Sequence, residues 1–259
     1  MTRVLVVGAC GRMGQNLVRM LEGAGDLRLG GALEHASHPS LGQEISRGVK
    51  IGADAVAACA QADVAIDFSS PASTHALLDI AEARGLPLVI GTTGLDAEAE
   101  ARIARAARRL AIVRAANFSI GVTVLLELVA EAARRLEGYE IDVLELHHDQ
   151  KLDAPSGTAL ALARSAAEAR GQDLQHAAVY ERHGITGVRD PKSIGLQVLR
   201  LGDSIGEHTV YFSGPGERVE LAHRAFSREN FATGALRAAR WLVGRAPGLY
   251  AMRDVLRPS

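Results

Sequence analysis

A glycine-rich turn near the start of the chain constrains the fold more than any other sequence feature. The mostly apolar run from Arg3 to Val7 predicts a strand covered on both faces, and Gly8-Ala-Cys-Gly11-Arg-Met-Gly14 follows it. A helix is predicted over Gln15 to Leu21, then a second strand over Leu27 to Leu33 that ends at Glu34. Strand, glycine turn, helix, strand and acid in this order are typical of a dinucleotide-binding unit.

Each part of this unit has a physical role toward a dinucleotide. Glycines let the backbone turn tightly and approach a pyrophosphate, whose charge rests on the helix N-terminus. Glu34 is predicted to accept hydrogen bonds from the adenosine ribose. The spacing is GxxGxxG rather than GxGxxG, and the alternative is that the glycines serve only a tight strand–helix turn. The acid at the end of the second strand favours nucleotide binding.

Strands and helices continue to alternate through the first half of the chain. Strands are predicted over Val64 to Phe68, Pro87 to Ile90 and Leu110 to Val113, and helices over Ser73 to Arg84 and Ala97 to Arg109. This alternation predicts a parallel sheet with helices on both faces.

Ligands of such sheets bind at the carboxyl ends of the strands. Three loops follow predicted strands at that edge: Asp67 to Ser70, Gly91 to Gly94 and Ala115 to Phe118. Any one of them is compatible with ordinary loop chemistry, but the three together predict a binding edge.

The second half of the chain has a different pattern, with strands that follow one another. The predicted elements are a helix over Ser119 to Leu136, a strand over Tyr139 to His148, a helix over Ala159 to Ala169, and strands over Ser193 to Gly202, His208 to Ser213 and Glu217 to Ser227. Successive strands suggest an open mixed sheet with one face available for subunit contact. The last helix, Asn230 to Val243, holds Trp241 and is expected to pack back against the first domain.

The predicted fold class is therefore α/β, with a Rossmann-like doubly wound parallel sheet plus a smaller α+β domain with an open mixed sheet. Residues 1–118 with 230–259 are expected to form the dinucleotide-binding domain, and residues 119–229 the second domain.

The segment from Glu145 to Thr158 carries the densest chemistry. His147, His148 and Lys151 lie within five residues, just before a Pro-Ser-Gly-Thr sequence that leads into a predicted helix. Imidazole titrates near neutrality, so it can act as a general acid, and free N–H groups at a helix start bind carboxylates or phosphates. The segment predicts a site for a small acidic substrate that is protonated as it reacts. The alternative is that the histidines are polar residues at a strand end and that Ser156 is an ordinary N-cap.

Composition excludes several other classes of protein. Hydrophobic residues make up 47% of the 259 and the net charge is −1, so the basic surface of a nucleic-acid binder is missing. No apolar run approaches the ~18 residues of a membrane span, and the first run is too short for a signal peptide. Cys10 and Cys59 form no pairing pattern, and His147-His148 lacks the spacing of a metal-binding helix. We expect a cytoplasmic protein with no metal, no membrane and no nucleic-acid partner.

The chain resembles the family of 4-hydroxy-tetrahydrodipicolinate reductase, also called dihydrodipicolinate reductase, of the diaminopimelate and lysine pathway. Glu145 to Thr158 matches the family pattern E-x-H-H-x-x-K-x-D-A-P-S-G-T. Further similarity covers nearly the whole chain in the right order, at Gly8 to Gly14, Gly91 to Gly94, Asn117 to Val122, Gly206 to His208 and Gly248 to Leu256.

This resemblance implies a reductase that uses NADH, NADPH or both, acts on a small dicarboxylate and forms a homotetramer through its C-terminal sheets. It implies that His147 and Lys151 are the catalytic proton donors and that His148, Ser156, Gly157 and Thr158 bind the substrate. The implied cofactor-binding residues are Gly8, Ala9, Cys10, Gly11, Arg12, Met13, Glu34, Gly91, Thr92, Thr93, Ala115, Ala116, Asn117 and Phe118. His208 is expected to support the site without a direct role.

Two positions depart from the family pattern. His35 stands where many members have an arginine suited to the 2′-phosphate of NADPH, which favours NADH, although Arg12 could still reach that phosphate. Cofactor choice is therefore open, with dual use as the working hypothesis. Thr123 replaces a frequent asparagine in a helix, where we expect little effect.

Two other functions remain open from the residues alone. Another two-domain dehydrogenase, such as one acting on aspartate or homoserine, would use the same first domain but would not need the His-His-x-x-Lys segment. A catalytically idle sensor that binds NAD(P) would not need both His147 and Lys151.

Overall fold

The structure, a computed structural model, describes residues 1–257. The chain divides into two compact units, Met1–Ile120 together with the chain from Arg228 onward (unit 1) and Gly121–Ser227 (unit 2). The boundaries that we expected from the sequence lie two residues away from these. Each unit has its own sheet and its own core.

Unit 1 is built on an eight-stranded sheet in the order β13-β7-β6-β5-β1-β2-β4-β3. All neighbouring strands are parallel except the β3–β4 pair. The strands are β1 (Thr2–Val7), β2 (Leu27–Leu33), β3 (Glu44–Ser46), β4 (Val49–Gly52), β5 (Val64–Asp67), β6 (Leu88–Ile90), β7 (Ala111–Arg114) and β13 (Gly248–Tyr250).

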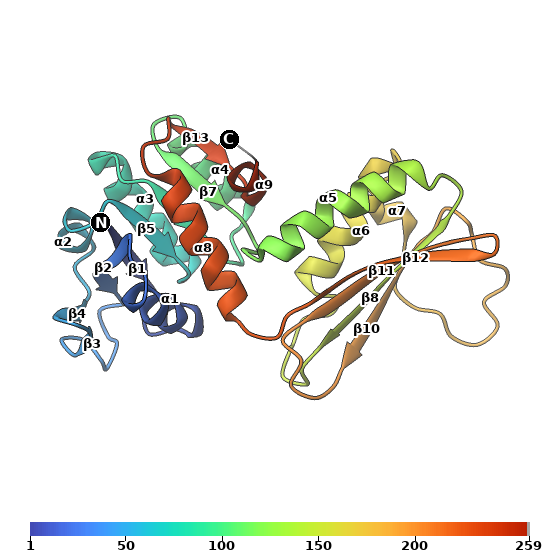
Figure 1. The fold of residues 1–259 in the computed structure, drawn as a ribbon, viewed down its shortest axis with the longest axis horizontal. Coiled ribbons are helices and arrows are strands. Elements are labelled where there is room, and N and C mark those ends of the chain that lie inside the picture. The colour runs from blue at the N-terminus through green and yellow to red at the C-terminus, as the bar shows by residue number, and fades with distance from the viewer. Residues whose placement is uncertain (258–259) are drawn as a thin grey trace. The chain divides into compact units, whose positions relative to one another are not determined.

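Helices cover both faces of this sheet (Figure 1). One core holds side chains from α1, α8 and α9, and the other holds side chains from α2, α3 and α4. The helices are α1 (Arg12–Glu22), α2 (Ala55–Ala60), α3 (Pro71–Arg84), α4 (Ala97–Ala106), α8 (Glu229–Leu242) and α9 (Met252–Leu256). The doubly wound parallel sheet predicted from the sequence is confirmed, and α8 packs in unit 1 against α1, β5, β6 and β7.

Strand β1 shows why its sequence is so apolar. Val4 and Val6 point into one core and Leu5 and Val7 into the other, and none is more than 1% exposed. Alternate residues of a strand face opposite sides of the sheet, so a strand between two helix layers needs apolar residues throughout.

The helix after the glycine turn begins at Arg12, three residues earlier than we predicted. Gly11 is its N-cap, and Gly14 lies in the first turn. A side chain at Gly14 would overlap the backbone of Gly8 and Ala9, so only glycine lets the helix approach the strand this closely.

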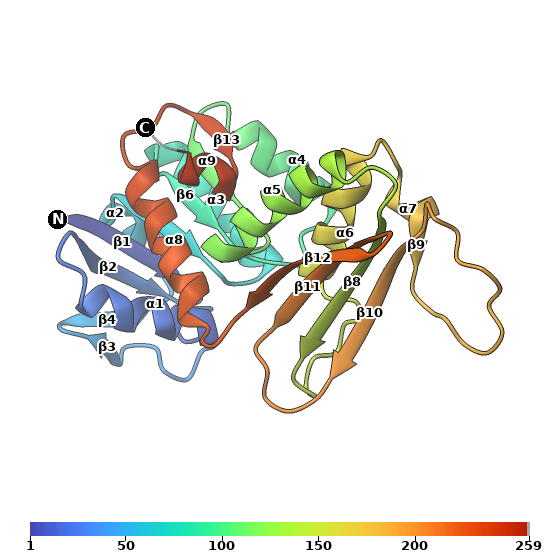
Figure 2. The same ribbon diagram turned by 45° about the vertical axis from the view of Figure 1, so that its right-hand side comes forward.

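Unit 2 has a five-stranded sheet in the order β12-β11-β8-β10-β9 (Figure 2). The β8–β10 and β10–β9 pairs are parallel and the β8–β11 and β11–β12 pairs antiparallel, so the predicted mixed sheet is confirmed. The elements are α5 (Ile120–Arg135), β8 (Glu140–His147), α6 (Gly157–Ala169), α7 (Leu174–Ala177), β9 (Ala178–Val179), β10 (Ile194–Arg200), β11 (Glu207–Gly214) and β12 (Glu217–Arg224).

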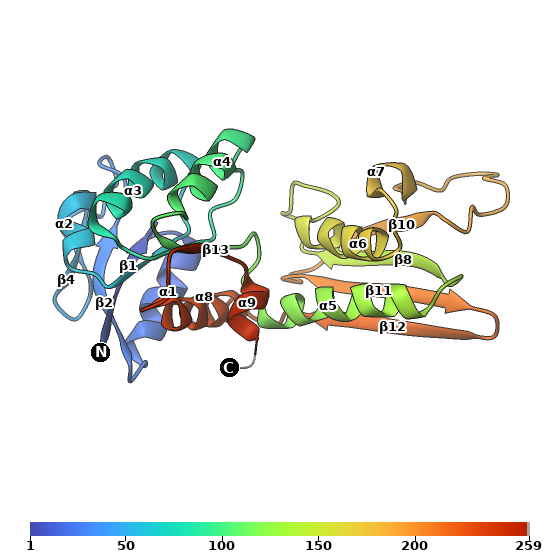
Figure 3. The ribbon, with the colours of Figure 1, turned by 90° about the horizontal axis from the view of Figure 1, so that it is seen from above.

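Helices α5 and α6 run beside one another along one face of this sheet (Figure 3). On β8 every second residue is buried: Ile141, Val143, Glu145 and His147. Because alternate residues share a face, these four point toward the helices. The strand therefore carries two apolar core residues and then two ionisable ones along the same face.

Short elements were absent from the sequence prediction: β3, β4, α2, α7, β9, β13 and α9. Helix α6 begins at Gly157, two residues before the predicted start, because the Ser156 side chain caps it. Within residues 1–257, no helix is both long enough and apolar enough to cross a membrane.

Candidate active site

The predicted cofactor residues of unit 1 lie in loops at one edge of its parallel sheet. Gly8 to Gly11 follow β1, with Arg12 and Met13 in the first turn of α1. Gly91 to Thr93 follow β6, and Ala115 to Phe118 follow β7. Since β1, β5, β6 and β7 are parallel neighbours, these loops share the carboxyl edge of the sheet.

Glu34 is held against the glycine turn. The Cys10 N–H donates to Glu34 Oε1 at 2.8 Å, and the Gly8 N–H donates to the Leu33 carbonyl at 2.9 Å. The acid after β2 is thus fixed beside the turn after β1, as a ribose-binding role requires. Burial, followed by the Glu34 charge, raises the pKa of the Cys10 thiol, which fits a small packing residue rather than a reactive thiol.

A buried aspartate braces two of these loops. Asp67, fully buried at the end of β5, accepts hydrogen bonds from Ser69 Oγ and Thr74 Oγ1, both at 2.5 Å. The Ser69 N–H also donates to Thr92 Oγ1 at 3.1 Å, which links the loop after β5 to the loop after β6. Burial raises the pKa of Asp67, although its hydroxyl partners oppose this.

Phe118, at the end of the loop after β7, packs against Phe68 at this edge of the sheet. It is 1% exposed and meets the Phe68 ring edge-to-face, with ring centres 5.4 Å apart. Asn117 Oδ1 accepts a hydrogen bond from the Ser119 N–H at 2.7 Å, which fixes the turn before α5.

Cys10, Glu34 and His38 bring three potential metal-ligand atoms within 4.8 Å of one another. The Ser40 N–H donates to His38 Nδ1 at 3.2 Å. A neutral ring that accepts there carries its proton on Nε2, so neither nitrogen offers a free lone pair to a metal.

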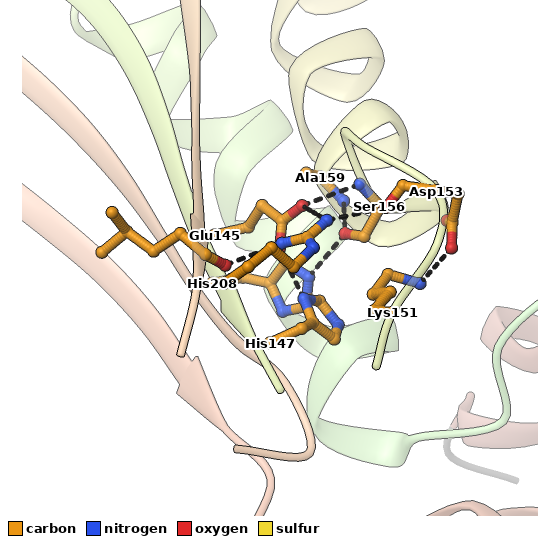
Figure 4. Close-up of polar contacts among 9 residues, drawn as sticks. Glu145, His147, Lys151, Asp153, Ser156, Ala159 and His208 are labelled. Carbon is orange, nitrogen blue, oxygen red and sulfur yellow. Dashed lines mark hydrogen bonds and ion pairs between the residues drawn. The ribbon is translucent and has the colours of Figure 1, made fainter. Parts of the chain in front are cut away.

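In unit 2 the predicted proton donor His147 is the last residue of β8 (Figure 4). Its side chain is 11% exposed, and Nδ1 forms a short hydrogen bond with Oε2 of Glu145, two residues earlier on the same face of the strand. A carboxylate acceptor fixes the Nδ1–H tautomer, so Nε2 is the nitrogen left to exchange a proton.

Glu145 is 1% exposed, yet all its neighbours favour its charged form. The Ser156 N–H donates to Oε1 at 2.9 Å, and the Arg200 guanidinium donates to both oxygens, each at 2.9 Å. Burial alone would raise the pKa of Glu145, but His147, Arg200 and the Ser156 N–H outweigh it and lower this pKa to about 2.

Ser156 joins the helix to the sheet. Its Oγ accepts a hydrogen bond from the Ala159 N–H at 3.1 Å and lies 3.0 Å from His208 Nε2. Its side chain is buried, so the hydroxyl is engaged within the protein. Gly157 and Thr158 then form the start of α6, where the helix dipole favours an anion.

His208, at the start of β11, packs edge-to-face on His147 with ring centres 5.2 Å apart. Burial, followed by the nearby positive charge of His147, lowers the pKa of His208 to about 3. His208 is therefore neutral at physiological pH and supports the His147 ring without adding charge.

The second predicted proton donor, Lys151, lies in the loop between β8 and α6. Its Nζ is 2.8 Å from Oδ1 of Asp153, and this contact lowers the pKa of Asp153. The same loop holds His148, whose N–H donates to the Ser204 carbonyl at 2.8 Å. His148 Nδ1 is buried and has no hydrogen-bond partner within residues 1–257.

Gly206 leaves room for the His147 ring. A Cβ atom there would lie 2.9 Å from His147 Nε2, so any side chain would press on this nitrogen.

The fold thus brings His147, Lys151 and the start of α6 to one end of the unit 2 sheet. Sequence reasoning missed Arg200 and gave Glu145 no role of its own. The alternation of Glu145 and His147 on a strand could have indicated a shared face. Nothing in the sequence around Arg200 marks it, because it lies on another strand.

Comparison with known proteins identifies relatives along nearly the whole chain. The sequence profile described as "Dihydrodipicolinate reductase, N-terminus" matches residues 2–118, and the one described as "Dihydrodipicolinate reductase, C-terminus" matches residues 121–256. The 4-hydroxy-tetrahydrodipicolinate reductase of Anaeromyxobacter dehalogenans is 48% identical over 264 aligned residues, covering 99% of this chain and 98% of that protein. The enzyme of the same name from Thiobacillus denitrificans is 48% identical and covers 98% of each chain.

A solved structure has the same fold. The dipicolinate-bound dihydrodipicolinate reductase of Paenisporosarcina sp. TG-14 is 26% identical, with a TM-score of 0.80, over 99% of this chain and 100% of the other. The chain therefore belongs to the dihydrodipicolinate reductase family, whose curated members are named 4-hydroxy-tetrahydrodipicolinate reductase.

Proposed function

We propose that this chain reduces 4-hydroxy-tetrahydrodipicolinate to tetrahydrodipicolinate with NADH or NADPH, in diaminopimelate and lysine biosynthesis. The observation that carries this proposal is the assembly of His147 and Lys151 beside the start of α6, in a full-length relative of enzymes with that name. Loss of water from the substrate gives a conjugated imine, which then takes up one hydride and one proton.

The cofactor residues are those at the carboxyl edge of the unit 1 sheet. The glycine turn from Gly8 to Met13 receives the pyrophosphate, and Glu34, fixed by the Cys10 N–H, faces the ribose. The loops Gly91 to Thr93 and Ala115 to Phe118 hold the rest of the dinucleotide. Bound nicotinamide supplies the hydride, and the protein supplies orientation and protons.

The substrate is a small dicarboxylate, as the dipicolinate bound to the Paenisporosarcina relative suggests. Backbone N–H groups of Gly157 and Thr158, at the positive end of α6, hold one carboxylate. His148 binds the substrate from the adjoining loop. Ser156 acts indirectly, because its buried hydroxyl caps α6 and contacts His208.

His147 and Lys151 donate protons. Glu145 holds His147 Nδ1, so Nε2 delivers the proton while the carboxylate stabilises the charged ring before transfer. Lys151 pairs with Asp153 in the absence of ligand, and a substrate carboxylate or developing amine nitrogen competes for the same ammonium.

We further propose that the enzyme is a cytoplasmic homotetramer. On the unit 2 sheet, the face away from α5 and α6 carries Leu144 and Leu146 of β8 and Leu199 of β10, which is 40% exposed. Apolar side chains on a sheet face without a helix layer are typical of subunit contacts. Light scattering should give four times the mass of one chain.

The function is tested by following oxidation of NADH and of NADPH, with the substrate made in place from pyruvate and aspartate semialdehyde by the preceding synthase. Turnover that needs the synthase is the expected result. Nucleotide binding without turnover would overturn the proposal and favour another imine or keto acid, or a sensor.

A further inference from the structure

Arg200 connects the two proposed proton donors. It ends β10, directly opposite His147 in the parallel β8–β10 pairing, and its side chain is 19% exposed. Nη1 and Nη2 donate to Glu145, which holds His147. Nη2 also donates to the backbone carbonyl of Asp153 at 2.7 Å, in the loop whose Asp153 side chain pairs with Lys151. One guanidinium therefore reaches the supports of both donors.

The chemistry of the three groups favours a fixed geometry. A guanidinium is a rigid planar fork that can hold both oxygens of a carboxylate and still donate a further hydrogen bond, whereas an ammonium cannot reproduce this arrangement. Glu145 is too deeply buried to stay ionised without such a partner. An ionised Glu145 in turn keeps His147 in one tautomer and one orientation.

We propose that the Arg200–Glu145 ion pair is a positioning unit that sets His147 and the Lys151 loop relative to each other for proton transfer. Neither residue needs to touch the substrate, and both act through the donors they hold. This inference rests on the proposed function of His147 and Lys151.

The same sheet offers a matched control. Arg189 pairs with Asp142 of β8 at 2.5 Å and also donates to the carbonyls of Ile141 and Ser193, each at 2.8 Å. Its side chain is 18% exposed, similar to that of Arg200, but its partners hold neither proton donor. Loss of Arg189 therefore reports the general cost of removing a half-buried arginine from this sheet.

The test compares Arg200→Met and Arg200→Lys with Arg189→Met, each with folding checked by circular dichroism. We expect kcat to fall by about 100-fold in Arg200→Met, because small misplacement of reacting groups costs that much. Arg200→Lys should recover part of the stability but little of kcat. Arg189→Met should keep kcat within about threefold, because its partners hold neither proton donor and its loss affects mainly stability. Affinity for NADH should be unchanged in all three.

The pH profile of kcat gives a readout that a merely structural role would not move. Glu145→Gln removes the charge that stabilises the protonated ring, so the alkaline limb should move to lower pH. Arg200→Met leaves Glu145 without the cation that keeps it ionised, so His147 loses the same negative charge and the limb should again move to lower pH. Displacement to lower pH in both variants supports the positioning unit, and limbs that stay in place overturn it.

Equal losses of kcat in Arg200→Met and Arg189→Met would also overturn the inference. If Arg200→Met does not fold, the alkaline limbs of the kcat profiles of Arg200→Lys and Glu145→Gln provide the test instead. Failure of the proposed function is a separate result, because the unmodified protein would then show no turnover with the synthase-made substrate.

Discussion

Two buried acids, one in each unit, have pKa values shifted in opposite directions. Asp67 in unit 1 is fully buried and has only hydroxyl and N–H partners, and its pKa is raised. Glu145 in unit 2 is 1% exposed, contacts Arg200 and His147, and has a pKa lowered to about 2. Both side chains are buried and burial raises both pKa values, but only Glu145 has charged partners that lower its pKa again.

This difference reflects how each unit builds its binding edge. Unit 1 presents backbone turns that are braced by hydrogen bonds from hydroxyl and N–H groups, which suits a cofactor that is bound and then released. Unit 2 presents ionised side chains in a fixed hydrogen-bond network, which suits proton transfer to a substrate. The following predictions test that division, beginning with the largest effect.

Lys151→Ala should lower kcat by about 1,000-fold, within the range of general acid catalysis, and leave nucleotide binding intact. Lys151 lies in unit 2, outside the cofactor edge. Steady-state kinetics and NADH titration measure the two quantities. A parallel loss of NADH affinity would show that the two edges do not divide the work as proposed.

Glu145→Gln should destabilise unit 2 by about 3 kcal/mol near neutral pH, the value of a pKa lowered from 4.5 to about 2. Because the folded-state pKa is depressed, this stabilisation is present above pH about 4.5 and is lost as pH falls toward 2. Urea unfolding of both proteins from neutral to acid pH measures it. A difference that stays constant with pH would contradict the ionised assignment.

His35→Arg should raise the preference for NADPH over NADH by about tenfold, the effect of one charge-assisted contact to a phosphate. His35 now contacts Ser37 Oγ at 3.0 Å and is exposed, so the replacement needs no repacking. The ratio of kcat/KM values for the two cofactors is the readout. An unchanged ratio would assign phosphate recognition to another residue, such as Arg12.

Asp67→Asn should change stability least, by about 1 kcal/mol or less, and with the opposite pH dependence. A raised folded-state pKa means that Asp67 stabilises the fold most below its ordinary pKa of 3.8 and costs stability as pH rises through the raised value. The free energy of unfolding of the unmodified protein, relative to that of Asp67→Asn, should therefore fall as pH rises. Parallel pH trends for the Asp67 and Glu145 variants would remove the contrast between the units.

The sequence predicted the elements whose signal is local. Strand β2 has the predicted bounds, because its apolar run ends at an acid. The start of helix α1 was predicted three residues late, because glycines in a sequence usually indicate a loop. Only the structure shows that Gly14 lets the helix approach the backbone of Gly8 and Ala9. Strand β13 was not predicted, because three residues with one glycine carry no periodic pattern.

In the candidate site, His147 and Lys151 could be proposed because they are close in sequence. Arg200 could not be given a role and His208 could be given only a general supporting one, since strand pairing brings them beside Glu145 and His147 from more than 50 residues away. The local sequence pattern indicates which residues can take part in the reaction. The pairing of distant strands determines which other residues position them.

The path of the chain through unit 1 also bears on the order of events during synthesis. Helix α8 supplies Ala232, Ala235, Leu236 and Leu242 to the core that covers one face of the unit 1 sheet (Figure 1). All of unit 2 leaves the ribosome before α8 does. Until α8 is synthesised, this apolar face of the nascent unit 1 sheet is therefore covered only in part, by α1, while unit 2 already has all the residues that it needs to fold. A chaperone that acts on this protein during translation should recognise the α8-facing side of the first sheet.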